Sequence, residues 1–217
     1  MYEINNKYYL PKPYLSYSAM NDFYYNKKRF QDKYYRGIEG PGTPELVFGK
    51  RIGELLEHGD ASLEHIPHGD VAEKELKYEV DGIPILGYLD SFRTEDSYIF
   101  EFKTGKTPWT QGRVDKHFQL DVYSLGVEIL EGKVNDECML IWMETRKVEK
   151  PRNGRSFHSS DYEIEFTGKV REFKRIITAD DRKAAFDRIV TIAQDISEDY
   201  TDWLASQKKP LGGRQLK

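Results

Sequence analysis

Cysteine is nearly absent from this chain: Cys138 is the only one among 217 residues. A single cysteine excludes an internal disulfide, and it excludes any iron–sulfur cluster or zinc site that is built from several cysteines. Proteins without disulfides are typical of reducing compartments, so we expect a cytoplasmic, intracellular location.

Long hydrophobic runs and an excess of positive charge are also lacking. No apolar stretch approaches the roughly 20 residues of a membrane span, and residues 1–6 do not form a basic region followed by an apolar stretch. We therefore expect neither a signal peptide nor a membrane partner. The formal net charge of -4 excludes a surface that is basic throughout, although local basic patches remain compatible with DNA binding.

What remains is the composition of a polar globular protein, with 38% hydrophobic and 32% charged residues. A chain of 217 residues is long enough to form one sizeable core. We predict a single domain over residues 1–207 and a flexible C-terminal tail over residues 208–217, which contain Pro210, Gly212 and Gly213.

Four stretches have the spacing of helices that bury one side. The first runs from Ala19 to about Tyr35, after the N-cap candidate Ser18. The others cover about 44–58, 115–130 and 180–206. The buried sides are predicted to be Leu46, Phe48, Ile52, Leu55 and Leu56 in the second helix, and Phe118, Val122, Leu125 and Ile129 in the third.

Strands are predicted between these helices. Asp81-Gly82 between two apolar stretches is a strong signal for a two-residue hairpin. The predicted strands cover residues 77–80, 83–92, 98–103, 138–145 and 162–166. The apolar strand Cys138–Thr145 is expected in the interior of the sheet.

Three charged side chains near the middle of the chain form a candidate site. With a period of two residues, Glu101 and Lys103 point to the same side of their strand, whereas the aromatic residues at 98, 100 and 102 point to the other. Asp90 closes the preceding strand. Carboxylates are hard oxygen ligands for a divalent cation, and an amine can hold a water or a phosphate. The alternative is a solvated strand surface, which is common for so short a motif.

A second pair of polar side chains lies on the predicted helix over residues 115–130. Gln119 and Tyr123 are four residues apart and therefore share one helix face, which is offset from the core stripe and can look into a cleft. The amide can fix a phosphate or Lys103, and the phenol can hydrogen-bond to or stack on a nucleic acid. The alternative is an ordinary amphipathic helix with a half-buried tyrosine.

These motifs, taken in order, resemble the PD-(D/E)XK nuclease superfamily, in particular its RecB-like and Cas4-like exonuclease branch. The resemblance covers roughly residues 15 to 124. It rests on Leu15-Ser-Tyr-Ser18, Phe23, Arg29-Phe30, Gly49, Leu56-Glu57, Gly87-Tyr-Leu-Asp90, Glu101-Phe-Lys103 and Gln119-Leu-Asp-Val-Tyr123. Several weak motifs in the right order are far more specific than any one of them.

The resemblance implies an α/β fold with a restriction-endonuclease-like core, in which helices flank a central mixed sheet. It also implies that Asp90, Glu101 and the Phe102 carbonyl hold Mg²⁺ or Mn²⁺. Lys103 would orient the attacking water and stabilise the developing negative charge. The Gln-x-x-x-Tyr pair would belong to the catalytic and substrate-binding group.

Two departures from the family pattern matter. The family commonly has a histidine four residues after the glycine of its second helix, and Gly53 stands there in this chain. Glu54 could supply the missing metal ligand, with Glu57 one turn away as its rival. Many relatives also bind an iron–sulfur cluster through four cysteines, but Asn26-Lys27-Lys28 stands where the first would lie. We expect no cluster, and we expect the C-terminal helix to brace the domain instead.

Basic and aromatic residues near the predicted site are candidates for binding the nucleic acid. Trp109, in the loop after the predicted catalytic strand, is the best candidate for base stacking. The candidate phosphate contacts are Lys106, Arg113 and Lys116, together with Arg146, Lys147, Lys150, Arg152 and Arg155. An open alternative is that the last five form a solvated hairpin tip.

The resemblance therefore implies Mg²⁺-dependent hydrolysis of phosphodiester bonds in DNA, by an exonuclease that acts on ends or single strands. Two alternatives stay open. One is a structure-specific or restriction-type endonuclease on the same fold, and the other is a non-catalytic nucleic-acid-binding or assembly protein that retains the fold. By analogy, a compact nuclease of this type would suit a phage, a mobile element or a repair pathway.

Overall fold

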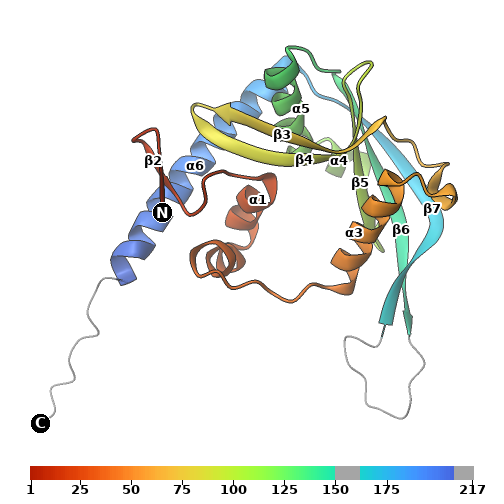
Figure 1. The fold of residues 1–217 in the computed structure, drawn as a ribbon, viewed down its shortest axis with the longest axis horizontal. Coiled ribbons are helices and arrows are strands. Elements are labelled where there is room, and N and C mark those ends of the chain that lie inside the picture. The colour runs from red at the N-terminus through yellow and green to blue at the C-terminus, as the bar shows by residue number, and fades with distance from the viewer. Residues whose placement is uncertain (150–161, 208–217) are drawn as a thin grey trace, which may run out of the picture. The chain divides into compact units, whose positions relative to one another are not determined.

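The computed structural model describes residues 1–149 and 162–207 (Figure 1). The predicted tail and the basic residues Lys150, Arg152 and Arg155 lie outside the described residues. The chain packs into two compact units. The first comprises Met1–Gly40, Lys77–Leu86 and Ala184–Lys217, and the second comprises Pro41–Leu76 and Gly87–Lys183. The single domain over residues 1–207 stays a prediction.

The described strands include a five-stranded mixed sheet in the order β3-β4-β5-β6-β7. Its strands are β3 (Val71–Val80), β4 (Ile83–Arg93), β5 (Tyr98–Gly105), β6 (Glu137–Glu149) and β7 (Tyr162–Ile176). β5 pairs antiparallel with β4 and parallel with β6, and β6 pairs antiparallel with β7. The chain crosses from β5 to β6 through the helices α4 (Gln111–Val114) and α5 (Phe118–Glu131), as a parallel pair requires. The predicted mixed α/β fold is confirmed.

The turn between β3 and β4 is the one that its sequence predicts. Asp81 and Gly82 both have positive φ, 50° and 74°. A tight two-residue hairpin needs this conformation at both positions, and Asp-Gly adopts it at low cost. The turn joins β3 to β4, which are neighbours in the sheet.

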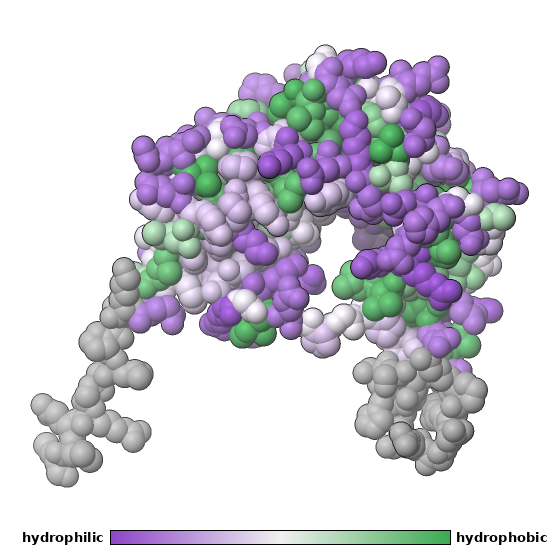
Figure 2. Space-filling model, in the orientation of Figure 1, coloured by the Kyte–Doolittle hydropathy of each residue, from purple (hydrophilic) through white to green (hydrophobic). Residues whose placement is uncertain are grey.

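Helix α3 (Pro44–Glu57) covers the core of the second unit, where it packs against β5 and β7. This core consists of Ile52, Leu56, Leu63, Ile66, Tyr98, Phe100, Ile141 and Met143. The prediction that Leu46 is buried is wrong, because it is 68% exposed. Leu46 precedes Phe48 by two residues, about 200° around the helix, so it points away from the packed side. Figure 2 shows the resulting hydrophobic surface over the first turns of α3.

Helix α5 is buried on more sides than a single stripe predicts. Its side chains from Gln119 to Val127 are buried, or nearly so, whereas Ile129 in the predicted stripe is 44% exposed. The helix begins at Phe118 rather than at Asp115, because the short helix α4 precedes it and the backbone is extended at His117. It ends at Gly132, whose φ of 69° suits a glycine cap.

The first unit contains the remaining short elements. They are β1 (Tyr2–Ile4), β2 (Tyr8–Leu10), α1 (Tyr17–Tyr25), α2 (Lys27–Phe30) and a π-helical turn (Gln31–Tyr35). The single helix predicted from Ala19 to Tyr35 is wrong. The backbone leaves helical geometry at Asn26, whose side chain caps α2 by accepting from the Arg29 N–H. The N-cap is Ser16 rather than Ser18, because Ser16 Oγ accepts from the Ala19 N–H.

The C-terminal helix α6 (Ala179–Gln207) contributes most of its length to the first unit. Its Asp199 pairs with Lys27 at 2.6 Å and accepts hydrogen bonds from Gln31 and Tyr35. These contacts tie the segment around Lys27 to α6 within the first unit, and the predicted bracing role of this helix stays a prediction. Within the described ranges, no helix combines the length and the apolar character needed to cross a membrane.

Candidate active site

Asp90 and Glu101 lie next to each other where β4 and β5 separate, inside the second unit. The strands are paired as far as Ser91 and Phe100. Beyond that point, Asp90 Oδ2 accepts the Phe102 N–H at 2.7 Å in place of a backbone carbonyl. The Asp90 carboxylate is thereby fixed beside β5. Burial raises the pKa of Asp90, while the charge of Lys103 opposes the rise.

The Glu101 carboxylate is buried, with 1% of the residue exposed. Its Oε1 accepts from the Lys103 ammonium, whereas its Oε2 has no hydrogen-bond partner among the described residues. Burial and the neighbouring Asp90 charge raise the pKa of Glu101 to about 8, against the effect of Lys103. A buried carboxylate oxygen without a donor is costly, and a bound cation would remove that cost. The solvated strand surface considered from the sequence is therefore wrong for Glu101.

Lys103, Gln119 and Tyr123 form a continuous hydrogen-bonded chain. Lys103 Nζ donates to Gln119 Oε1 at 2.8 Å, and Gln119 Nε2 donates to the Tyr123 hydroxyl at 2.9 Å. Of the roles left open for Gln119, contact with the lysine is the one present here. Gly87 makes the arrangement possible, because a Cβ at that position would lie 2.9 Å from the Tyr123 ring. Position 87 must therefore be a glycine for the Tyr123 ring to pack against β4 in this way.

Asp90, Glu101, Lys103 and Gln119 line a pocket of about 870 Å³ between α3 and the strands. Its acidic walls are Glu45, Glu54, Glu57, Glu73, Asp90 and Glu101. The Glu54 side chain is 56% exposed and its nearest cation is Lys50, at 3.9 Å. The sequence motifs did not identify Glu73. Burial, Asp90 and Glu57, in that order, raise its pKa. The alternation of side chains along β3 predicts that Glu73 is exposed, but it does not predict that Glu73 lines the pocket.

The donor set fits a hard divalent cation. No group of three His, Cys, Asp or Glu side chains is close enough to hold an ion jointly within residues 1–149 and 162–207. Mg²⁺ is commonly bound through only one or two carboxylates, with waters and substrate phosphate completing its shell. Asp90 and Glu101 supply two carboxylates, and the unpartnered Glu101 Oε2 is an oxygen with no competing donor in the described structure. Asp90 and Glu101 therefore fit a divalent cation. Glu54 is not one of these two carboxylates.

The predicted substrate contacts fall into two groups. Lys106, Arg113 and Lys116 are exposed. Trp109 is only 8% exposed, and its ring packs 3.7 Å from the Arg113 guanidinium and 4.8 Å from the His117 ring. Its aromatic surface is thus covered by protein, which does not favour base stacking.

Arg146 and Lys147 are the described members of the predicted basic loop. Arg146 pairs with Glu165 at 3.1 Å, and Lys147 pairs with Glu45 at 2.9 Å. Both pairs are largely exposed to solvent. Both residues lie within β6 and not at a hairpin tip, and cations that are already matched by carboxylates are typical of a solvated strand surface.

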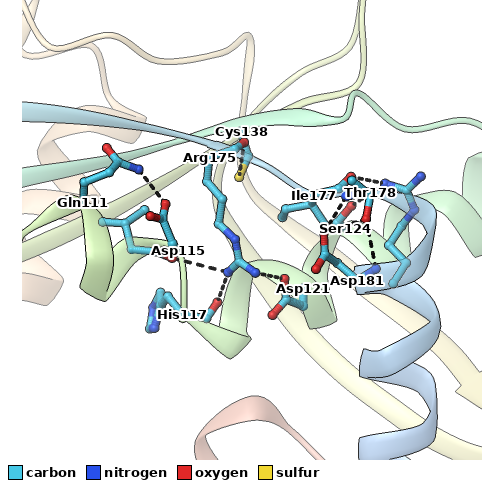
Figure 3. Close-up of polar contacts among 12 residues, drawn as sticks. Gln111, Asp115, His117, Asp121, Ser124, Cys138, Arg175, Ile177, Thr178 and Asp181 are labelled. Carbon is cyan, nitrogen blue, oxygen red and sulfur yellow. Dashed lines mark hydrogen bonds and ion pairs between the residues drawn. The ribbon is translucent and has the colours of Figure 1, made fainter.

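Arg175 on β7 holds the start of α5, and no sequence motif pointed to it (Figure 3). Its guanidinium is buried, pairs with Asp121 and donates to the His117 carbonyl at 2.8 Å. Asp121 lies between Gln119 and Tyr123 on the helix, so this contact holds the helix that positions both. Arg175 lies 54 residues from Asp121 in the sequence, so only the folded chain reveals the contact.

Replacing Arg175 by methionine is expected to lower the free energy of unfolding by about 3–5 kcal/mol, because it removes the buried cation that balances the Asp121 carboxylate. Urea unfolding measures the loss. The matched control is Arg146→Met, which breaks the exposed pair with Glu165 and should cost much less. Equal losses in the two variants would contradict the anchoring role of Arg175.

This chain is similar to solved structures, whereas no family model and no curated protein matches it. A structure from Eubacterium rectale, named as a candidate exonuclease, is similar with a TM-score of 0.50 at 12% identity, covering 96% of this chain and 89% of that chain. A phage-related exonuclease from Haemophilus somnus 129PT gives 0.49 at 13% identity, covering 88% and 83%.

The likeness to the Eubacterium rectale structure establishes the fold. The chain has the same mixed α/β fold as that structure, as the predicted fold class states. The candidate site lies wholly within the second unit, on the strands β4 and β5 and the helix α5.

Proposed function

We propose that this protein is a divalent-metal-dependent DNA nuclease, and that it acts as an exonuclease on DNA ends or single strands. The observation that carries the proposal is the buried Glu101 carboxylate, which has one oxygen on Lys103 and the other without a partner among the described residues, beside Asp90. The shared fold supports it, because the Eubacterium rectale structure is named as a candidate exonuclease.

In this proposal Asp90 and Glu101 hold the ion, together with the Phe102 carbonyl. When bound, a divalent cation would supply Lewis-acid chemistry there, by activating a water and by offsetting the negative charge of the scissile phosphate. Lys103 orients the attacking water and stabilises the negative charge that develops on the phosphate oxygens. The water oxygen bonds to phosphorus while the bond from phosphorus to the leaving sugar oxygen breaks.

Gln119 and Tyr123 act as positioning residues for Lys103. The Gln119 carbonyl oxygen accepts from the ammonium, and the Tyr123 hydroxyl accepts from the Gln119 amide. Neither group carries a charge, so these two contacts orient Lys103 without offsetting its positive charge. The exposed Lys106, Arg113 and Lys116 are proposed to contact the DNA backbone, which they can attract through their charge.

Cleavage of three DNA substrates tests the proposal. With Mg²⁺, we expect an end-labelled linear duplex or single strand to be degraded and a covalently closed circle to stay intact. EDTA and the variant Asp90→Asn should both abolish degradation. Cutting of the circle would indicate an endonuclease instead, and binding without cleavage of any substrate would contradict the enzymatic proposal.

A further inference from the structure

Glu73 occupies the space beside Gly53 in the wall of the pocket. A Cβ built on Gly53 would lie 3.9 Å from Glu73 Oε1. This distance is ordinary van der Waals contact, so the Glu73 carboxylate is the direct neighbour of position 53. Gly53 lies on α3 and Glu73 on β3, so only the folded chain shows that the two positions are neighbours.

The backbone of Glu73 is held in an uncommon conformation. Its φ is 47°, in the left-handed region that residues other than glycine rarely adopt. Such a conformation costs free energy, and residues that keep it are concentrated at functional sites. At Glu73 the strained residue is also one whose side chain lines the pocket with Asp90 and Glu101.

A second observation points to a ligand in this pocket. Glu101 is 1% exposed and lines the pocket, and its Oε2 has no hydrogen-bond partner among the described residues. An acidic wall alone would be a solvated surface, but a buried carboxylate oxygen without a donor needs a cation or a donor from outside the protein.

We propose that Glu73 is the third acidic group of the ion site, and that it acts from the position that Gly53 leaves open. The proposal rests on the proposed function in requiring a divalent cation at Asp90 and Glu101. Because three acidic side chains are not grouped closely enough to share an ion directly in the described structure, Glu73 accepts hydrogen bonds from waters bound to that ion. Glu54, which pairs with Lys50 along α3, is then not the substitute ligand.

Binding of Mn²⁺ alone, followed by electron paramagnetic resonance without DNA, tests this role. Glu73→Gln should weaken Mn²⁺ binding about 10-fold or more, as is usual when a group that supports a metal site is removed. The matched control is Glu75→Gln, which makes the same change two residues along β3 and outside the pocket. Glu75→Gln should bind Mn²⁺ like the wild type, and Glu54→Gln should change the affinity by less than about 3-fold.

A double variant keeps the test independent of folding defects. Removing the carboxylate with Glu73→Ala frees the space next to residue 53, so adding Gly53→His should place a metal-binding imidazole there and recover Mn²⁺ affinity. If Glu73→Gln binds Mn²⁺ as tightly as the wild type while Asp90→Asn does not bind it, the role of Glu73 is overturned and the ion site at Asp90 and Glu101 stands. Failure of the wild type to bind Mn²⁺ at all would overturn both this role and the proposed function.

Discussion

Replacing Glu101 by glutamine is expected to abolish Mg²⁺-dependent cleavage and, in the same protein, to stabilise the metal-free form above pH 8. The pKa of Glu101 is raised from its ordinary 4.5 to about 8, chiefly by burial and then by the Asp90 charge. Below pH 4.5 the group is protonated in both folded and unfolded chains and has no effect. As the pH rises to about 8 the unfolded chain loses this proton first, so the folded state is progressively destabilised.

The wild type should therefore lose stability across this window, by about 2–4 kcal/mol from this group, and Glu101→Gln should not. Urea unfolding in EDTA between about pH 5 and pH 9 measures the difference, with Glu79→Gln as the control for an exposed glutamate. Substantial cleavage by Glu101→Gln would contradict the metal-site assignment. An unchanged pH dependence of stability would contradict the burial of an ionisable Glu101.

Replacing Lys103 by alanine is expected to reduce the rate of cleavage by about 10²–10³ while divalent-ion binding is retained, because an ammonium that stabilises developing charge contributes on this scale. The amine is not assigned as a ligand, although it contacts Glu101 Oε1. Calorimetric titration with Mn²⁺ separates the two effects. A loss of metal affinity as complete as that of Asp90→Ala would show that Lys103 acts through the ion site and not on the phosphate.

The part of the site that the sequence predicted depends on short-range rules. Period two places Glu101 and Lys103 together, and the antiparallel pairing of β4 with β5 across the turn at residues 94–97 brings Asp90 beside them. The helical spacing of Gln119 and Tyr123 predicted a shared face, and the two side chains are hydrogen-bonded to each other. The mixed sheet followed from the order of these elements.

The part that could not be predicted depends on contacts between distant segments. Glu73 belongs to no motif, and its place next to Gly53 arises from the packing of α3 against the sheet. Similarly, Arg175 on β7 pairs with Asp121 on α5, far away in the sequence. Trp109 was expected to stack on bases, but packing against Arg113 and His117 covers its ring, which no local pattern reveals.

The helix boundaries were predicted wrongly where side chains compete with the backbone for hydrogen bonds. Asn26 accepts a backbone N–H and interrupts a pattern whose apolar spacing continues through it. Ser18 was predicted as the cap of the first helix, but Ser16 has the extended backbone of a cap and accepts the Ala19 N–H. Neither error changes the site, which lies in the second unit.

Anomalous diffraction from crystals of the wild-type protein soaked in Mn²⁺ tests most directly whether Asp90 and Glu101 hold the ion. We expect a peak at coordination distance from both carboxylates, and no such peak in crystals of Asp90→Asn. A map without a peak at these two carboxylates, at Mn²⁺ concentrations that support cleavage, would contradict the metal site and the mechanism built on it.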